Sequence, residues 1–504
     1  MDLRNGFRSL PALFLFFPVA VRCETLYLDG SLKEDCDKYD VVSRSCGAGS
    51  ERAFAESGPA LSKLVAGDTL LLREGRYEQL EIPVSGQPGS PIAIRSYPGE
   101  TATISDKSNV AIRVTGKSDI VVAGLSVDGV VGFGRVEDST GIEFDRIAFR
   151  HALASGTTGA LKFVRSSRNR VEDSSFDDGS DLLLLQDDSN LNVLLNNRFG
   201  RAVHSLVSVR CSSRNIIRGN SFNNPKEKAV EIFDCEGVSD APVRLDDTKF
   251  NLMEFNRFEG TAESSRDYYF NAIQHGGQHT IVRYNLFTDN RGGGVNYQYY
   301  SDESLFVYGN RLYNNTFYRN DCHAIIGQSG RRSQFRDNLV LDNLLYDNRD
   351  CDGRPGQTHI KDPRSVVWLD NAETGKDPHF MDAANGDFHL SQGSSMIDAG
   401  SFATRAAASG SGTTLRVKDA SWFFDGYGID AEQGDIVRIE GHPESARILQ
   451  VDYKNNTLML ETSLQWRRGD GVHVLYSGDA PDMGAFEAGP DSLRERVARG
   501  RREP

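Results

Sequence analysis

The segment from residue 266 to residue 283 gathers side chains that can carry charge or transfer protons. Arg266 and Arg283 are cationic at any physiological pH, and His275 titrates near neutrality. The segment also holds Tyr269, Asn271 and Gln274, and it is followed by Tyr297 and Tyr299. These residue types together suit a site that binds an anion and moves a proton.

Cleavage of a uronic acid polymer by β-elimination requires this set of groups. A cation or amide neutralises the uronate carboxylate, a base removes the α-proton, and an acid protonates the leaving oxygen. Arg266, Arg283, Asn271 and Gln274 are candidates for neutralising the carboxylate. His275 and His204 are candidate bases, and Tyr269 and Tyr297 are candidate acids.

These residues lie within a repeat that must position them. An Asn followed two residues later by an apolar residue recurs from Asn197–Phe199 to Asn338–Val340, with weaker copies from Val127 onward. The period is near 23 residues and is lengthened between residues 222 and 317. Short strand-like segments fill each repeat, which predicts a solenoid, here a parallel β-helix.

The recurring Asn fits the turn of such a coil. Its amide can hydrogen-bond to the same residue in the coils above and below, and Asn tolerates the left-handed conformation that sharp turns need. The cysteines test this register, because Cys211 and Cys235 are one coil apart, as are Cys322 and Cys351. We therefore expect disulfides Cys211–Cys235 and Cys322–Cys351, together with the local pair Cys36–Cys46.

Aligning the repeats brings polar residues of successive coils into columns. One column holds Asp181, His204, Lys228 and Tyr269, and a second holds Asp187, Arg210, Asp234, His275 and Gln328. Glu231 and Gln274 lie between the columns and should face outward. Adjacent strands are about 4.8 Å apart, so these groups can meet across coils. Arg210 is a candidate for binding substrate.

Three early stretches and four late ones resemble the opening and closing segments of secreted right-handed parallel β-helix proteins. The early stretches are 66–77, 89–97 and 124–129, and the late ones are 377–382, 386–390, 397–400 and 482–487. Polysaccharide lyases of the chondroitinase B and alginate lyase kind, in the pectate lyase-like superfamily, begin in this way. The resemblance implies an all-β, right-handed parallel β-helix that acts on polysaccharide, and it concerns structural motifs more than activity.

Enzymes of the chondroitinase B kind use a lysine base, an arginine and a calcium ion held by acidic residues. Lys228 with Glu231 and Asp234 is the one cluster here that is similar to this arrangement. Calcium is therefore the cofactor that the resemblance suggests, with Glu231 and Asp234 as ligands. These residues do not reproduce the family's motif, so its catalytic assignments are not carried over.

The organisation expected along the chain has six parts. They are a signal peptide (1–23), an N-terminal cap with a short helix (24–75), the β-helix (76–403), an inserted small antiparallel β-barrel or sandwich (404–477), a closing β-helix segment (478–490) and a basic disordered tail (491–504). The aromatic loop 422–427 of the insert either stacks on sugar rings or packs against the β-helix.

Export is indicated by the N-terminus and by the cysteines. Arg4 and Arg8 precede an apolar run from Leu10 to Val21, which is the layout of a secretory signal peptide. Removal of residues 1–23 leaves an even number of cysteines, as disulfide-bonded exported proteins have. A lipoprotein anchor at Cys23 is the alternative. The protein is expected to be secreted or periplasmic.

Composition limits the partners. The net charge of −14 argues against nucleic acid as the main partner, and no apolar run after the first 25 residues is long enough to span a membrane. The expected function is that of a monomeric lyase that cleaves an acidic polysaccharide. A glycoside hydrolase, a uronate C5-epimerase and a non-catalytic polysaccharide-binding or adhesion protein remain alternatives.

Overall fold

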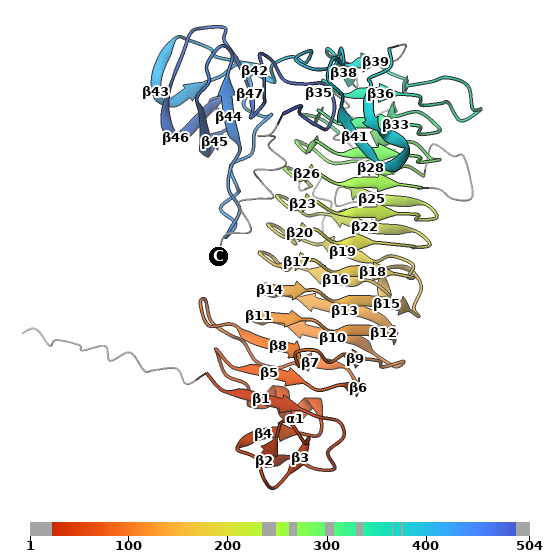
Figure 1. The fold of residues 1–504 in the computed structure, drawn as a ribbon, viewed down its shortest axis with the longest axis vertical. Helices are drawn as coiled ribbons and strands as arrows, with labels where there is room; N and C mark the ends of the chain where they lie inside the picture. The colour runs from red at the N-terminus through yellow and green to blue at the C-terminus, as the bar shows by residue number, and fades with distance from the viewer. Residues whose placement is uncertain are drawn as a thin grey trace, which may run out of the picture.

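The chain forms a long three-sided solenoid with a small β domain beside one end (Figure 1). The computed structural model describes residues 23–233, 248–261, 270–297, 307–328, 336–364, 366–373 and 376–489. Parallel pairing between strands of successive coils builds three long sheets, here named A, B and C in the order in which each coil visits them.

Sheet A runs the whole length of the solenoid, and its first strands form the N-terminal cap. In spatial order it contains β3 (Ser45–Cys46), β2 (Cys36–Asp40), β4 (Glu51–Phe54), β1 (Thr25–Leu28), β5 (Thr69–Leu72), β8 (Ile92–Ser96), β11 (Ser118–Ala123), β14 (Thr140–Asp145), β17 (Arg170–Glu172), β20 (Val193–Leu195), β23 (Ile216–Arg218), β26 (Leu252–Glu254), β29 (Ile281–Arg283), β32 (Arg311–Tyr313), β35 (Asn338–Leu341) and β38 (Val366–Trp368).

Sheet B follows a tight turn after sheet A. It contains β6 (Gly75–Tyr77), β9 (Ala102–Ile104), β12 (Ser126–Val130), β15 (Ala148–Ala152), β18 (Ser175–Asp177), β21 (Arg198–Phe199), β24 (Ser221–Asn223), β27 (Arg257–Glu259), β30 (Leu286–Thr288), β33 (Thr316–Tyr318), β36 (Leu344–Tyr346) and β39 (Ala372–Glu373).

Sheet C completes each coil and carries the candidate site. It contains β7 (Leu80–Ile82), β10 (Val110–Thr115), β13 (Gly132–Glu137), β16 (Leu161–Val164), β19 (Leu183–Gln186), β22 (Ser205–Arg210), β25 (Lys228–Phe233), β28 (Ile273–His275), β31 (Val295–Tyr297), β34 (Ile325–Gly327) and β37 (Thr358–Ile360). In Figure 1 its strands lie between those of sheet A on the left and sheet B on the right.

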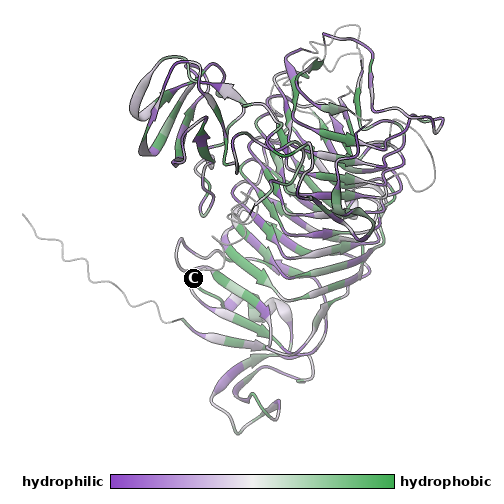
Figure 2. Cartoon of the chain, turned by 45° about the horizontal axis from the view of Figure 1, so that its top comes forward, coloured by the Kyte–Doolittle hydropathy of each residue, from purple (hydrophilic) through white to green (hydrophobic). Residues whose placement is uncertain are grey.

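The interior is filled by apolar side chains that stack coil upon coil. Along sheet B, seven phenylalanine rings from Phe149 to Phe317 form a continuous stack with centroid separations from 4.5 to 5.1 Å. Their positions are the apolar residues that define the sequence repeat. Figure 2 shows the corresponding alternation of hydrophobic and hydrophilic residues along the strands.

The turn between sheets A and B carries the predicted asparagine ladder. Asn285 donates from Nδ2 to Asn315 Oδ1 at 3.0 Å and to the backbone carbonyls of Met253 and Arg283, and its Oδ1 accepts from Asn256. The left-handed residue of this turn is the one before the ladder asparagine, such as Tyr284, and not the asparagine itself. The asparagine is therefore selected for its buried amide, not for its backbone conformation.

Two further asparagine ladders, which the repeat analysis did not identify, close the other turns. One precedes sheet A and joins Asn192 to Asn215 at 3.1 Å, and the other follows sheet B and joins Asn290 to Asn320 at 2.8 Å. Buried amides in these turns replace the water that a surface turn would use.

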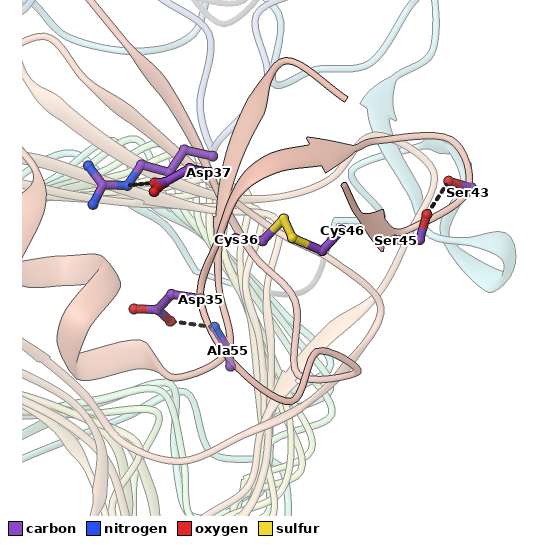
Figure 3. Close-up of a disulfide and its surroundings, with 8 residues drawn as sticks. Asp35, Cys36, Asp37, Ser43, Ser45, Cys46 and Ala55 are labelled. Carbon is purple, nitrogen blue, oxygen red and sulfur yellow. Dashed lines mark hydrogen bonds and ion pairs between the residues drawn. A yellow bond between two sulfur atoms is a disulfide. The ribbon is translucent and has the colours of Figure 1, made fainter. Parts of the chain in front are cut away.

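The N-terminal end of the solenoid is closed by a hairpin and a short helix. The helix α1 (Ser57–Lys63) buries Ala60 and Leu61 against the first coil, within the expected range 53–65. The disulfide Cys36–Cys46 ties strands β2 and β3, as predicted (Figure 3). Strands β1 and β5 already pair within sheet A, so the stacking begins before residue 76, where we placed the start of the β-helix.

The predicted disulfide Cys322–Cys351 is also present. Cys211 is disulfide-bonded, and its predicted partner Cys235 lies outside the described residues. Disulfides of this kind fit an extracellular or periplasmic location. In the part of the chain that the structure describes, no helix has the length and apolar character needed to span a bilayer.

A small antiparallel sheet follows the solenoid. Its strands, in spatial order, are β42 (Thr404–Arg405), β47 (Gly471–Val474), β44 (Ile436–Ile439), β45 (Ser445–Asp452), β46 (Thr457–Trp466) and β43 (Gly410–Arg416). A hairpin of β40 (Phe380–Asp382) and β41 (Asp387–Leu390) precedes it, with a short 3₁₀ helix at Ala383–Asn385, and a second 3₁₀ helix lies at Gly156–Thr158.

The small sheet packs on the outer face of sheet A through buried charges and aromatic rings. Arg283 in β29 is 1% exposed and lies 2.6 Å from both Glu254 in β26 and Asp435. Trp422 and Tyr427 belong to the same apolar cluster, so the aromatic loop 422–427 packs against the β-helix and does not form a sugar-stacking surface. The catalytic role that we predicted for Arg283 is therefore wrong, because its guanidinium is buried in ion pairs at this interface.

Loss of a ladder amide should lower the stability of the solenoid. Asn285→Ala removes hydrogen bonds that no water can replace, and we expect a loss of about 1–3 kcal/mol in the free energy of unfolding. Denaturant unfolding followed by circular dichroism measures it. Asn455→Ala, which removes an exposed turn contact to Asp452, is the control and should change stability little. Equal effects of the two variants would contradict a special role for the ladder.

Removal of the buried cation at the domain interface should be more damaging. Arg283→Met leaves Glu254 and Asp435 buried without their shared partner, for which we expect a cost of about 3–5 kcal/mol. Arg319→Met breaks the half-exposed pair with Asp289 and should cost about 1 kcal/mol or less. Thermal unfolding of both variants tests this, and a stable Arg283→Met protein would show that the pair does not hold the interface.

Candidate active site

The candidate site lies on the outer face of sheet C, on strands β19, β22 and β25. In these strands Val207 pairs with Val230 and Val209 pairs with Ile232, and all four side chains fill the interior. The alternation of a strand then directs Ser208 and Glu231, which are register partners, to the outside. Both side chains lie outside the apolar core but are covered, since Ser208 is 1% and Glu231 0% exposed.

Glu231 is the centre of the cluster. Its Oε1 lies 2.5 Å from Lys228 Nζ, and its Oε2 accepts from Ser208 Oγ at 2.9 Å and from Arg210 Nη2 at 3.3 Å. His204 Nε2 lies 3.4 Å from Glu231 Oε1. One carboxylate therefore contacts a lysine, an arginine and an imidazole.

The charges around Glu231 determine its protonation. Burial alone would raise the pKa of Glu231, but the charges of Lys228, His204 and Arg210 outweigh burial and lower its pKa to about 2. Glu231 is thus a carboxylate throughout the physiological range and cannot donate a proton. Its role is to fix the positions of the cations.

His204 is held from its other side by an aspartate. Asp181, at the turn before β19, lies 2.7 Å from His204 Nδ1, and its side chain is 4% exposed. The hydrogen bond to Asp181 raises the pKa of His204, burial opposes the rise, and Glu231 adds to it. The imidazole therefore keeps its proton to a higher pH than a free histidine does, and Nε2 faces the cluster.

Arg210 and His204 reach the surface, whereas Lys228 lies deeper. Their side chains are 27%, 34% and 8% exposed, respectively. Arg210 also lies over the ring of Phe233, and its Nε is buried without a hydrogen-bond partner among the described residues. Arg210 is therefore accessible to a ligand through the exposed part of its guanidinium group and not through Nε.

His204, Lys228, Arg210 and Glu231 are neighbours across coils, as the repeat predicted, although the predicted columns separate some of them. Ser208 and Glu227, the last of which lies 3.7 Å from His204 Nε2, were not predicted as site residues. Asp181 stood in the same polar column as His204, so the signal for it was present in the repeat.

His275 and Tyr297 do not reach this surface. His275 pairs with Ile232 and Tyr297, and that column points into the solenoid, where both rings are fully buried with centroids 5.3 Å apart. Burial lowers the pKa of His275 to about 3 and raises that of Tyr297. The roles predicted for His275 as a base and for Tyr297 as an acid or substrate contact are wrong, because neither side chain is accessible.

His275 was assigned to the wrong column because the turn from sheet C to sheet A changes in length between coils. Val209 and Ile217 are eight residues apart, whereas their register partners in a later coil, His275 and Val282, are seven apart. Counting back a fixed number of residues therefore placed His275 in the column of Arg210. A slip of one residue in a strand exchanges its inner and outer faces.

The remaining predicted residues divide between buried positions and undescribed segments. Asn271 is buried and donates from Nδ2 to the carbonyl of Gly292 at 2.6 Å, which commits it to the backbone. Gln274 continues the outward column next to Glu231 and is also covered. Tyr269, Arg266, Tyr299 and Asp234 lie outside the described residues.

The described residues do not form the calcium site that the resemblance suggested. Both oxygens of Glu231 contact cationic groups, which leaves no carboxylate edge for a divalent ion. No cluster of three or more metal-ligating side chains occurs in the described ranges. A calcium ion does not fit around Glu231 in this arrangement, and no step of a reaction is derived from one.

Comparison with known proteins shows the fold. A family model described as a right handed beta helix region matches residues 100–239. The crystal structure of pectate lyase Pel9A superposes with a TM-score of 0.52 at 13% identity, covering 93% of this chain and 98% of that one. A PL6 family polysaccharide lyase from Pseudopedobacter saltans gives a TM-score of 0.44 at 14% identity, over 66% of this chain and 94% of that chain.

A sequence relative is the "Uncharacterized protein YwoF" of Bacillus subtilis (strain 168), 36% identical over 85 residues. The match spans 15% of this chain and 18% of that protein. The right-handed parallel β-helix with a small antiparallel sheet near the C-terminus, which the sequence predicted, is thus confirmed as the fold.

The raised pKa of His204 can be measured directly. Its pKa should lie above the usual value near 6.5, and Asp181→Asn should lower it, because the main stabilising hydrogen bond to the imidazolium is weakened. NMR titration of the imidazole protons, assigned with His204→Gln, gives both values. His151, which has a similar partner in Asp128 on sheet B, should be unaffected by Asp181→Asn.

The raised pKa of His204 also makes the stability of the fold depend on pH in a defined direction. Since folding raises the pKa of His204, its contribution is complete below pH about 6.5 and is lost as the pH rises through the higher folded value. Asp181→Asn should reduce this pH dependence. An unchanged His204 titration in that variant would contradict the assigned pair.

Proposed function

We propose that this protein cleaves a uronic-acid-containing polysaccharide by β-elimination at the cluster of His204, Arg210 and Lys228. The observation that carries the proposal is the convergence of two cations and one titratable imidazole on Glu231, on the outer face of a β-helix. The flat, elongated face of sheet C suits an extended polymer. The fold shared with pectate lyase Pel9A supports the same class of substrate.

Each group has a role that its surroundings allow. Arg210, which is partly exposed, neutralises the uronate carboxylate and makes the α-proton acidic. Neutral His204 accepts that proton at Nε2, with Asp181 holding the opposite nitrogen. The ammonium of Lys228, oriented by Glu231, donates a proton to the leaving oxygen.

The step balances without any co-reactant. The α C–H bond breaks and its electron pair forms the new carbon–carbon double bond, while the bond from the β-carbon to the glycosidic oxygen breaks. The oxygen leaves with a proton from Lys228, and His204 holds the proton taken from the α-carbon. Exchange of these two protons through solvent restores the starting state.

The charge state of Glu231 favours elimination over hydrolysis. A glycosidase needs one carboxyl group whose pKa is raised, so that it can protonate the glycosidic oxygen. The pKa of Glu231 is instead lowered to about 2 by its cationic neighbours. Glu231, the carboxyl group at the centre of the cluster, is therefore unsuited to that task. A location outside the cytoplasm, where such polymers occur, agrees with the disulfides.

The test is the ultraviolet absorbance of unsaturated uronate products. The full chain is mixed with pectate, alginate, chondroitin, heparan sulfate and hyaluronan, and we expect absorbance to rise with at least one polymer. His204→Gln and Lys228→Met should each lower the rate about 100-fold or more. His151→Gln removes a comparable histidine–aspartate pair on sheet B and should leave the rate unchanged.

Activity should also depend on pH with a defined sign. Because the base must be neutral, the rate should rise with pH through the raised pKa of His204, and Asp181→Asn should move this limb to lower pH. Release of reducing ends without absorbance would instead identify a hydrolase. Solvent-hydrogen exchange at the α-carbon without cleavage would identify an epimerase, and binding alone would identify a non-catalytic protein.

A further inference from the structure

Three carboxylate groups contact the imidazole of His204, and they differ in the nitrogen that they approach. Asp181 lies 2.7 Å from Nδ1, whereas Glu231 and Glu227 lie 3.4 and 3.7 Å from Nε2. In the elimination proposed above, Nε2 is the atom that takes the α-proton. A group that removes this proton afterwards must contact Nε2, which excludes Asp181.

Glu231 and Glu227 differ in their access to water. The side chain of Glu231 is 1% exposed, and that of Glu227 is 31% exposed. The two oxygens of Glu231 also contact Lys228 and Arg210, and the cationic neighbours of Glu231 lower its pKa to about 2. Glu231 therefore neither binds a proton readily nor passes one to solvent, whereas Glu227 reaches the surface.

The sheet holds the backbone of Glu227 beside His204. Each of these residues directly precedes one member of the register pair Ser205–Lys228, at the turn that leads into sheet C. The amide of Lys228 donates to the carbonyl of His204 at 3.0 Å, so the ladder of the sheet joins the two positions. Among the residues that the structure describes, the contact with His204 is the one ion pair of Glu227. Its carboxylate is therefore not engaged by a second cation.

His204 needs a route by which its proton can leave. The hydrogen bond to Asp181 raises the pKa of His204, which makes the imidazole a stronger base but slows the loss of its proton to water. A polymer whose α-carbon lies over Nε2 also excludes water from that atom. A carboxylate that contacts both the imidazole and the solvent removes this difficulty, because it accepts the proton over a short distance and passes it outward.

We propose that Glu227 is a proton relay, which carries the proton taken by His204 to the solvent. After elimination the Nε2–H bond breaks, its electron pair stays on the nitrogen, and the proton binds a carboxylate oxygen of Glu227. The neutral carboxyl group then gives the proton to water or to a buffer base, and both side chains regain their starting charges. Glu227 thus acts through His204 and not on the sugar. This inference rests on the proposed function, because it concerns the proton that elimination leaves on His204.

Kinetics at varied buffer concentration test the relay. The full chain is assayed by ultraviolet absorbance at constant pH and ionic strength, with the polymer that it cleaves. At low buffer concentration, the kcat of Glu227→Gln should be about 10-fold lower than that of the unaltered protein, and a high concentration of a small buffer such as imidazole should restore it. The ratio kcat/KM should not change, because the relay acts after the glycosidic bond has broken.

Two further variants serve as controls. Glu227→Asp keeps a carboxylate on a shorter side chain, and its kcat should lie between those of Glu227→Gln and the unaltered protein. Glu259→Gln removes a partly exposed carboxylate on β27 of sheet B, where Glu259 contacts Arg257, and it should change neither kcat nor its dependence on buffer. Thermal unfolding shows whether the three variants fold. Equal decreases of kcat and kcat/KM in Glu227→Gln would overturn the relay, because Glu227 would then act before or during bond cleavage.

A second measurement does not depend on elimination. Exchange of the His204 Nε2 proton with water, followed by NMR in the free protein at low buffer concentration, should be about 10-fold slower in Glu227→Gln. Slower exchange in a protein that forms no unsaturated product would support proton transfer through Glu227 and contradict the lyase. Elimination with an unchanged kcat in Glu227→Gln at low buffer concentration, or a loss of kcat that buffer does not restore, would overturn the relay and leave the lyase standing.

Discussion

Each coil of this protein depends on its neighbours, because the polar groups of its turns are buried and only the next coil can satisfy them. The amide of Asn285 hydrogen-bonds to Asn256, Asn315 and two carbonyl groups, and comparable asparagine ladders lie in the other two turns of each coil. The stacked phenylalanine rings impose the same dependence on the apolar interior. Every strand is therefore fixed in register with the one before it, and the outer face inherits that order.

Sheets A and C each carry a cluster of charged side chains on the outer face, and the two clusters differ in their accessibility. On sheet A, Arg283 is enclosed by Glu254, Asp435 and Tyr313. Its ion pair with Asp435 attaches the small antiparallel sheet to the solenoid. On sheet C, Glu231 gathers Lys228, Arg210 and His204, yet Arg210 and His204 stay partly exposed. The first arrangement is closed to ligands, whereas the second leaves an arginine and a histidine partly accessible. Residue type alone does not separate them, because both combine arginine with carboxylate.

A β-helix also sets the scale on which a polymer can be recognised. Because one coil adds one strand of sheet C, side chains in a column recur at the strand spacing, and the candidate cluster occupies three coils. The backbone repeat thus turns a sequence period near 23 residues into evenly spaced columns of outward side chains.

The sequence by itself determined the solenoid, since its period, its turn asparagines and its paired cysteines all reflect contacts between adjacent coils. It also indicated that His204, Lys228, Arg210 and Glu231 would meet, because strands β22 and β25 follow each other at the sequence period of about 23 residues. Which polar residues face outward in the coils after β25 was decided only by the tertiary structure. A turn shorter by one residue directs His275 into the core, and the docking of the small sheet buries Arg283. Both effects depend on side-chain direction and on packing between distant segments, which a count of residues along the chain does not contain.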